Sequence, residues 1–206
     1  MNLINRLMPK NEKLQMMHDD PNLLERMTKR ILSWTPVTSR DYVIICIGTD
    51  RSTGDAFGPF AGSYLAEKKP KHIHLYGTLH DPVHAANMEN YFRYIRMEHR
   101  NPFVIAVDAS LGKSASVGTI TADTGSLKPG AALNKKLPEI GDIHLTGVVN
   151  IGGFMEYSIL QNTRLSLVVA MAKRMSELLY RIDEQLVHTH TLSKLAAAND
   201  KSERMI

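Results

Sequence analysis

The sequence is poor in cysteine, and it contains neither a long apolar run nor a long run of one charge. Cys46 is the single cysteine among 206 residues, which excludes an internal disulfide. It lies within the apolar run 42–47, and this position predicts a buried and unreactive thiol. Low cysteine content is typical of a reducing compartment, so we expect a cytoplasmic protein.

Membrane and nucleic-acid partners are not expected from the distribution of apolar and charged residues. No segment reaches the roughly 18 consecutive apolar residues of a membrane span, and the N-terminus lacks the apolar stretch of a secretory signal. Lys and Arg number 25 against 21 Asp and Glu, which gives a formal net charge of +4. Because these charges are scattered and form no basic stripe, we do not expect nucleic acid as a partner.

The composition, 43% hydrophobic and 22% charged, is typical of a globular domain with a full core. Residues 1–18 show only loose periodicity, which predicts an extension or a frayed short helix. A helix is then expected between an N-cap at Asp20 and Pro36. We predict three parts of the chain: an N-terminal extension and helix at 1–38, a single α/β hydrolase-like domain at 39–187, and a polar C-terminal tail at 188–206.

Short apolar runs alternate with helical patterns along the middle of the chain. We predict strands at residues 42–47, 72–76, 103–107, 117–122 and 143–149, and helices at residues 60–67, 83–97 and 154–186. Apolar strands that alternate with helices are typical of parallel βαβ units. The stretch after Asp108 alternates instead, and residues 124–137 form a predicted loop. The sequence therefore predicts a three-layer α/β/α sandwich with a mostly parallel mixed sheet.

Asp55 is the first candidate site residue. It lies in the glycine-containing loop 48–59, between the first buried strand and the next helix. The commonest role of an aspartate at such a place is an N-cap. The alternative is a functional carboxylate, because ligands of open α/β sheets bind beyond the carboxyl ends of the strands. The loop matches neither the dinucleotide-binding fingerprint nor the Walker sequence.

Asp108 is the second candidate, and it directly follows the predicted strand 103–107. A carboxylate at the tip of an apolar strand is costly to desolvate unless it meets a metal, a donor or a catalytic partner. If Asp55 and Asp108 face one cleft, like charge forces them to share a proton. One carboxylate can then act as base on a water while the other, protonated, polarises a carbonyl. Sequence spacing alone leaves the structural and the functional interpretations open.

His144 is the third candidate, and it alternates with apolar residues in the predicted strand 143–149. A lone histidine in a strand is more often structural, but with Asp55 and Asp108 it would complete a set of ligands for a divalent metal. The sequence matches no closed zinc site at its other clustered histidines, which are His72, His74, His80 and His84.

Several segments resemble known spore proteins. Residues 54–59, Gly-Asp-Ala-Phe-Gly-Pro, are similar to the P-D-A-L-G-P segment of the spore germination protease, and residues 107–109 are similar to its V-D-A-L strand end. Residues 119–130 resemble a later segment of that protease. Residues 143–164 resemble more closely the YyaC-type spore protease family of endospore-forming bacteria. Both families resemble the hydrogenase maturation proteases.

This resemblance implies a phosphorylase/hydrolase-like fold and a sporulation-associated peptidase. The germination protease is regarded as an atypical aspartic peptidase with two aspartates, and these positions fall on Asp55 and Asp108. The maturation proteases bind nickel through acidic residues and a histidine, which implies Asp55, Asp108 and His144 as ligands of nickel or zinc. The chain departs from the germination protease at Gly54, where that family has proline, and it is much shorter.

Three functions are compatible with the sequence: a peptidase, a non-catalytic peptide- or protein-binding module, and a metal-dependent maturation-type protease. The implied partner is a protein or peptide substrate, such as a spore protein, in the forespore or mother cell. In the peptidase, amides of the loop 48–58 are expected to hold the developing oxyanion. The apolar side chains of residues 154–175 offer enough surface for a homodimer.

Overall fold

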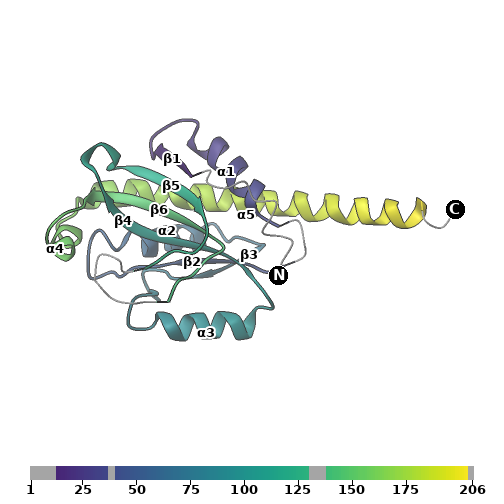
Figure 1. Cartoon of the computed structure of the whole chain (residues 1–206), viewed down its shortest axis with the longest axis horizontal. Coiled ribbons are helices and arrows are strands. Elements are labelled where there is room, and N and C mark those ends of the chain that lie inside the picture. Colours follow the sequence, from purple (N-terminus) through teal and green to yellow (C-terminus); the bar gives the residue numbers. More distant parts are fainter. Residues whose placement is uncertain (1–12, 37–39, 130–137, 204–206) are drawn as a thin grey trace.

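The computed structural model describes residues 13–36, 40–129 and 138–203, and side chains as far as residue 186. Its strands form one sheet with the order β1-β5-β6-β4-β2-β3 (Figure 1). The strands are β1 (Leu14–Met17), β2 (Tyr42–Cys46), β3 (Ile73–Tyr76), β4 (Phe103–Gly112), β5 (Thr119–Thr124) and β6 (Ile143–Ile151). The helices are α1 (Leu23–Trp34), α2 (Phe57–Glu67), α3 (Met88–Glu98), the short 3-10 helix η2 (Ser114–Ser116), α4 (Glu156–Gln161) and α5 (Leu165–Glu203).

The sheet is mixed, with a parallel part and an antiparallel part. Strand β4 lies between β2 and β6 and is parallel to both, and β3 is parallel to β2. Strands β5 and β1 continue the sheet in antiparallel orientation beyond β6. The predicted mostly parallel mixed sheet is therefore confirmed.

Helices cover both faces of the sheet. Figure 1 shows α1, α2 and α5 on one face and α3 on the other. The side chains of β2 explain why a continuous apolar run is needed: Ile44 and Cys46 pack in the cluster with α1, α2 and α5, whereas Val43 and Ile45 pack in the cluster with α3. Cys46 is fully buried, and this burial raises the pKa of its thiol. The α/β/α sandwich and the buried thiol are both as predicted.

The prediction for the N-terminal segment is wrong at two points. Residues 14–17 form β1, an edge strand that pairs with β5 from Leu14↔Ala122 to Met17↔Thr119, and not a frayed helix. The N-cap of α1 is Asn22, and the Asp20 carboxylate accepts a hydrogen bond from the Asn22 amide at 2.8 Å instead. A turn therefore separates β1 from α1.

Several element bounds also differ from the sequence prediction. Strand β4 continues past Asp108, α2 begins earlier, and α3 begins later because Val83 makes a parallel bridge with Ile47. The predicted helix 154–186 is split into α4 and α5, and α5 extends to Glu203, into the segment predicted as a polar tail. The division into an extension, one domain and a tail remains a prediction, and most of the predicted loop lies outside the described residues, at 130–137.

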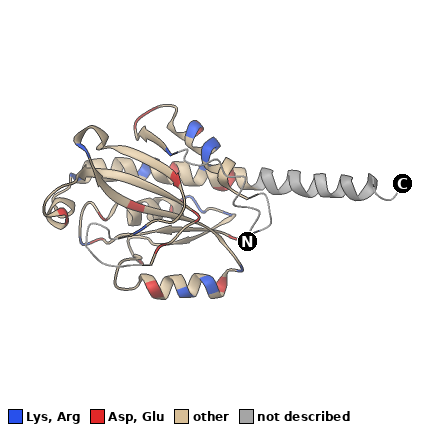
Figure 2. Ribbon diagram, in the orientation of Figure 1, with Lys and Arg blue, Asp and Glu red and all other residues tan. Residues whose placement is uncertain are grey.

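The described helices include none with the length and apolar character that crossing a bilayer demands. In Figure 2 the ribbon of α3 contains both basic and acidic residues. The expectation that nucleic acid is not a partner stays a prediction.

A buried carboxylate joins α5 to the start of β3. Asp183 is 2% exposed, and it accepts hydrogen bonds from the backbone amides of Lys71 at 2.9 Å and His72 at 2.7 Å. We expect Asp183→Ala to lower the free energy of unfolding by about 2 kcal/mol, because two amides lose their acceptor. Asp183→Asn should be less damaging, since one amide oxygen remains. Urea unfolding of the three proteins measures the difference, and equal stability of all three would contradict the assignment.

Candidate active site

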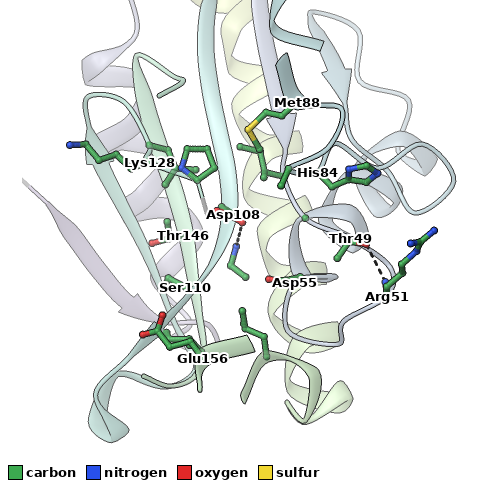
Figure 3. Close-up of a pocket in the computed structure, with 18 of the residues that line it drawn as sticks. Thr49, Arg51, Asp55, His84, Met88, Asp108, Ser110, Lys128, Thr146 and Glu156 are labelled. Carbon is green, nitrogen blue, oxygen red and sulfur yellow. Dashed lines mark hydrogen bonds between the residues drawn. The ribbon is translucent and has the colours of Figure 1, made fainter. Parts of the chain in front are cut away.

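A pocket of about 650 Å³ lies at the carboxyl ends of β2 and β4 (Figure 3). This is the position at which open α/β sheets bind ligands. Residues from six segments of the chain line it, including Thr49, Arg51, Asp55, His84, Asp108 and Glu156. The pocket therefore contains two of the three site residues that the sequence predicts.

Close backbone contacts hold Asp55 at the pocket. Gly48 has a φ of 144°, and a Cβ at this residue would lie 1.9 Å from the Asp55 carbonyl oxygen. The Thr49 amide donates to the same oxygen at 3.3 Å, and the Gly54 amide donates to the Leu160 carbonyl at 2.8 Å. The loop is thus folded back on itself and fixed to α4. The N-cap of α2 is Ala56, so the interpretation of Asp55 as an N-cap is wrong.

The start of α2 is packed tightly beneath the sheet. A Cβ at Gly58 would lie 2.0 Å from the Ile47 carbonyl oxygen, and a Cβ at Gly147 would lie 2.7 Å from the ring of Phe57. Only glycine allows these approaches, and they bring Asp55 to the end of β2. The loop glycines Gly48 and Gly58 therefore help to hold Asp55 at the pocket.

Asp108 lies within β4, not at its end. The strand continues to Gly112, and Asp108 is opposite Thr146 of β6 in the parallel register. One oxygen of its carboxyl group, Oδ1, accepts a hydrogen bond from the Ala109 amide at 2.8 Å. Figure 3 shows Asp55 and Asp108 in the same pocket, Asp55 from the loop and Asp108 from the strand.

The two carboxyl groups differ in their affinity for protons. Burial raises the pKa of Asp108 well above its usual value, the negative charge of Asp55 raises it further, and the Ala109 amide opposes the shift. Burial also raises the pKa of Asp55, against the opposing effect of the Ser52 hydroxyl. Because the charge of Asp55 adds to the effect of burial at Asp108, we expect Asp108 to be the residue that holds a proton. The pair then offers one acid and one base.

His144 is not among the residues that line the pocket. It lies in β6 as predicted, but its Nδ1–H donates to the Gly125 carbonyl at 3.0 Å, and Thr146, two residues further on, is the residue that reaches the pocket. Among the described residues, Asp55, Asp108 and His144 do not form a set with ligand atoms within 4.8 Å of one another. The three do not fit one nickel or zinc ion in this geometry, and that ligand set stays a prediction.

The pocket also contains side chains that the sequence analysis did not identify as site residues. His84 follows Val83, whose bridge to Ile47 brings it to the pocket. Its Nδ1 accepts a hydrogen bond from the Ala86 amide at 3.2 Å, which leaves Nε2 as the protonated nitrogen of a neutral ring. Glu156 is the first residue of α4 and follows Met155, which has a φ of 63°. No spacing in the sequence links either residue to Asp55 or Asp108.

One edge of β4 is unpaired where it borders the pocket. The Ile47 amide donates to the Val107 carbonyl at 2.7 Å, and in the described chain no strand pairs with this edge of β4 beyond that point. Pairing with β6 on the other edge continues to Gly112. Because backbone groups of alternate residues point to the same edge, those of Ala109 and Leu111 point toward the side that β2 has left. Both residues line the pocket.

The loop amides are largely engaged. The amide of Gly48 donates to the Val83 carbonyl at 2.9 Å, and the amides of Thr49 and Gly54 have the acceptors described above. These three groups cannot also hold an oxyanion, so the expectation that the loop forms an oxyanion hole is wrong for them.

Comparisons with known proteins place the chain in a family. A family model described as "Protein of unknown function (DUF1256)" matches residues 15–178. The "Uncharacterized protein YyaC" of Bacillus subtilis (strain 168) is 56% identical over 135 residues, a match that spans 66% of each chain and so just under two thirds of that relative. This similarity confirms the resemblance to YyaC.

A solved structure is similar at low identity. The [NiFe] hydrogenase maturation protease HycI from Thermococcus kodakarensis KOD1 aligns with a TM-score of 0.49 and 18% identity, over 74% of this chain and 99% of that chain. The family match covers most of the sequence, and the chain therefore belongs to the DUF1256 family.

Proposed function

We propose that this protein is a peptidase in which Asp55 activates a water molecule and protonated Asp108 polarises the scissile carbonyl. The observation that carries the proposal is the presence of both carboxyl groups in one pocket, with the pKa of Asp108 raised well above its usual value by burial and by Asp55. A carboxylate and a carboxylic acid side by side are what a two-aspartate hydrolysis needs.

The proposed reaction requires only these two residues and one water molecule. Asp55 removes a proton from water, and the water oxygen attacks the carbonyl carbon while Asp108 donates a hydrogen bond to the carbonyl oxygen. The carbon–nitrogen bond of the tetrahedral intermediate then breaks, and the leaving nitrogen takes the proton from Asp55. The products are a carboxylic acid and an amine, and the carboxylate of Asp55 is regenerated.

The unpaired edge of β4 supports a peptide as substrate. An extended peptide can add to this edge as a strand, with hydrogen bonds to the Ala109 carbonyl and to the amide and carbonyl of Leu111. Such pairing would run along the strand that carries Asp108 and so present a peptide carbonyl to it. Around Glu156, the side chains of Phe154, Met155 and Tyr157 are exposed, with Phe154 at 99%, and they offer apolar contacts to substrate side chains.

A spore protein is the proposed natural substrate, on the basis of the sequence resemblance to spore proteases. On the same basis, the cytoplasm of a forespore or mother cell is the proposed location. The apolar residues around α4 are exposed, and a homodimer would bury them. The proposed homodimer can be tested by size-exclusion chromatography. The unpaired strand edge favours a second candidate function, in which the pocket binds a peptide without cleaving it.

Asp55→Asn separates these functions. We expect the purified parent to cleave members of a peptide library and the variant to lose about 10³-fold or more of that rate, because the amide cannot take a proton from water. Asp50→Asn is the matched control, since Asp50 lies exposed in the same loop outside the pocket. Mass spectrometry of the products measures turnover. Peptide binding by the parent and by Asp55→Asn, without products from either, would favour the binding module.

His144→Ala in the same assay addresses the metal-dependent alternative. Because His144 lies outside the pocket, we expect it to lower turnover much less than Asp55→Asn does. Equal losses in the two variants, with metal present in the parent alone, would favour a metal-dependent protease.

A further inference from the structure

A second cluster of ligating side chains lies at the end of the sheet opposite the pocket. Asp41 directly precedes β2, His74 lies in β3, and His99 is the C-cap of α3. One ligand atom of each lies within 4.8 Å of those of the other two. The pocket begins at Ile47, after the carboxyl end of β2, so the length of this strand separates the two sites.

The fold brings these three residues together on the face of the sheet that α3 covers. The parallel register places His74 opposite Val43, which packs against α3. Asp41 is two residues before Val43, so its side chain points to the same face. The C-terminal end of α3 then brings His99 over both. No spacing in the sequence links His74 to Asp41 or His99.

We propose that Asp41, His74 and His99 bind a divalent transition-metal ion, with zinc as the best-fitting ion. Two imidazole nitrogens and one carboxylate oxygen are ligands that zinc prefers, and they leave a coordination position for water. The site is separate from the proposed catalytic pocket and does not depend on it.

The spacing between Asp41 and His99 fits two ligands of one ion. The Asp41 Oδ2 atom lies 3.2 Å from His99 Nδ1. Ligands at about 2.0 Å from a tetrahedral zinc ion are about 3.3 Å apart. The separation of these two atoms therefore matches that of two neighbouring ligands of one ion.

Tyr76 orients the His99 ring as a partner in the second coordination shell would. Its hydroxyl lies 2.8 Å from His99 Nε2. With an ion on Nδ1, Nε2–H would donate to this hydroxyl, and such a hydrogen bond to the remote nitrogen is usual for metal-binding histidines. His99 is 4% exposed, so its ring has little freedom to turn.

The remaining ligands are open to solvent. The side chain of Asp41 is 46% exposed, and His74 is also exposed. The His74 and His99 ring centroids are 4.3 Å apart, at an interplanar angle of 49°. Hydrogen bonding between Asp41, His99 and Tyr76 engages two of the three residues without an ion, and His74 contacts the ring of His99. A metal ion would engage all three residues.

Titration of tag-free protein with zinc tests the site. We expect calorimetry to show one ion per chain, cobalt to give the visible absorption of a low-coordinate site, and saturating zinc to raise the melting temperature by about 5 °C or more. His74→Ala and Asp41→Asn should each weaken binding at least about 100-fold, because a ligand is lost. Circular dichroism without metal shows whether these variants are folded.

Two controls separate this site from other zinc-binding groups. His80→Ala removes an exposed histidine outside the cluster and should leave binding unchanged. Asp108→Asn removes a pocket carboxylate and should also leave it unchanged, whether or not the protein is a peptidase. No stoichiometric binding, undiminished binding in folded His74→Ala, or loss of binding in Asp108→Asn would each overturn the proposal.

Discussion

Asp108→Asn is expected to abolish hydrolysis and, at neutral pH, to stabilise the fold. Asparagine has nearly the same shape as aspartate and keeps an oxygen that can accept the hydrogen bond from the Ala109 amide. It cannot donate a carboxyl proton to a substrate carbonyl, so we expect turnover to fall about 10³-fold or more. It is also uncharged beside Asp55 at every pH, whereas Asp108 is uncharged there only when it binds a proton.

The stabilisation should depend on pH in a defined direction. The pKa of Asp108 is higher in the folded than in the unfolded protein, so its contribution to stability is fully present below the unfolded pKa of about 3.8. That contribution is lost as the pH rises through the folded pKa, whereas asparagine does not titrate. The free energy of unfolding of the variant should therefore rise relative to that of the parent between acidic and neutral pH.

Urea unfolding of the parent and Asp108→Asn at pH 4 and pH 7.5 measures this difference. Asp50→Asn serves as a control for the removal of an exposed charge from the same side of the protein. A variant that is inactive but less stable than the parent at neutral pH would mean that Asp108 is held by favourable contacts, and the shared-proton mechanism would lose its basis.

Gly48→Ala is expected to destabilise the protein by about 3 kcal/mol or more, and to reduce turnover by about 100-fold. The new Cβ would lie 1.9 Å from the Asp55 carbonyl oxygen, and the φ of 144° is unfavourable for alanine. Since the obstructing atom belongs to the backbone, the loop itself must move, and Asp55 moves with it. Denaturant unfolding and steady-state cleavage measure the two effects.

Gly125→Ala separates backbone strain from steric contact. Gly125 has a φ of 92°, but a Cβ there meets no atom within 4 Å. Its substitution should cost only about 1 kcal/mol and leave turnover close to that of the parent. Similar effects from both substitutions would show that the contact with Asp55 is unimportant.

The parts of the fold that the sequence predicts are those with strong local patterns. Strand β2 is a continuous apolar run, and every residue in it is buried. Strand β1 has four residues and pairs with β5 about 100 positions away, so no local pattern reveals it. The length of β4 depends in the same way on β6, which pairs with it well beyond the apolar run that ends at Val107.

The site was partly predictable for a similar reason. Asp55 and Asp108 follow the apolar runs 42–47 and 103–107, which form neighbouring parallel strands. Alternation in β6 gives the face on which His144 lies but not its distance from the pocket, and two residues along a strand move a side chain by about 6.6 Å. His84 and Glu156 come from irregular segments, whose paths are determined by long-range contacts such as the bridge between Val83 and Ile47.

The unpaired edge of β4 limits the physical state of any molecule that binds there. Backbone pairing with Ala109 and Leu111 requires a partner whose own amides and carbonyls are free, and a residue inside a helix or sheet does not have them. The protein would therefore act on flexible tails, or on proteins that have already unfolded, and a compact substrate would be protected by its own stability.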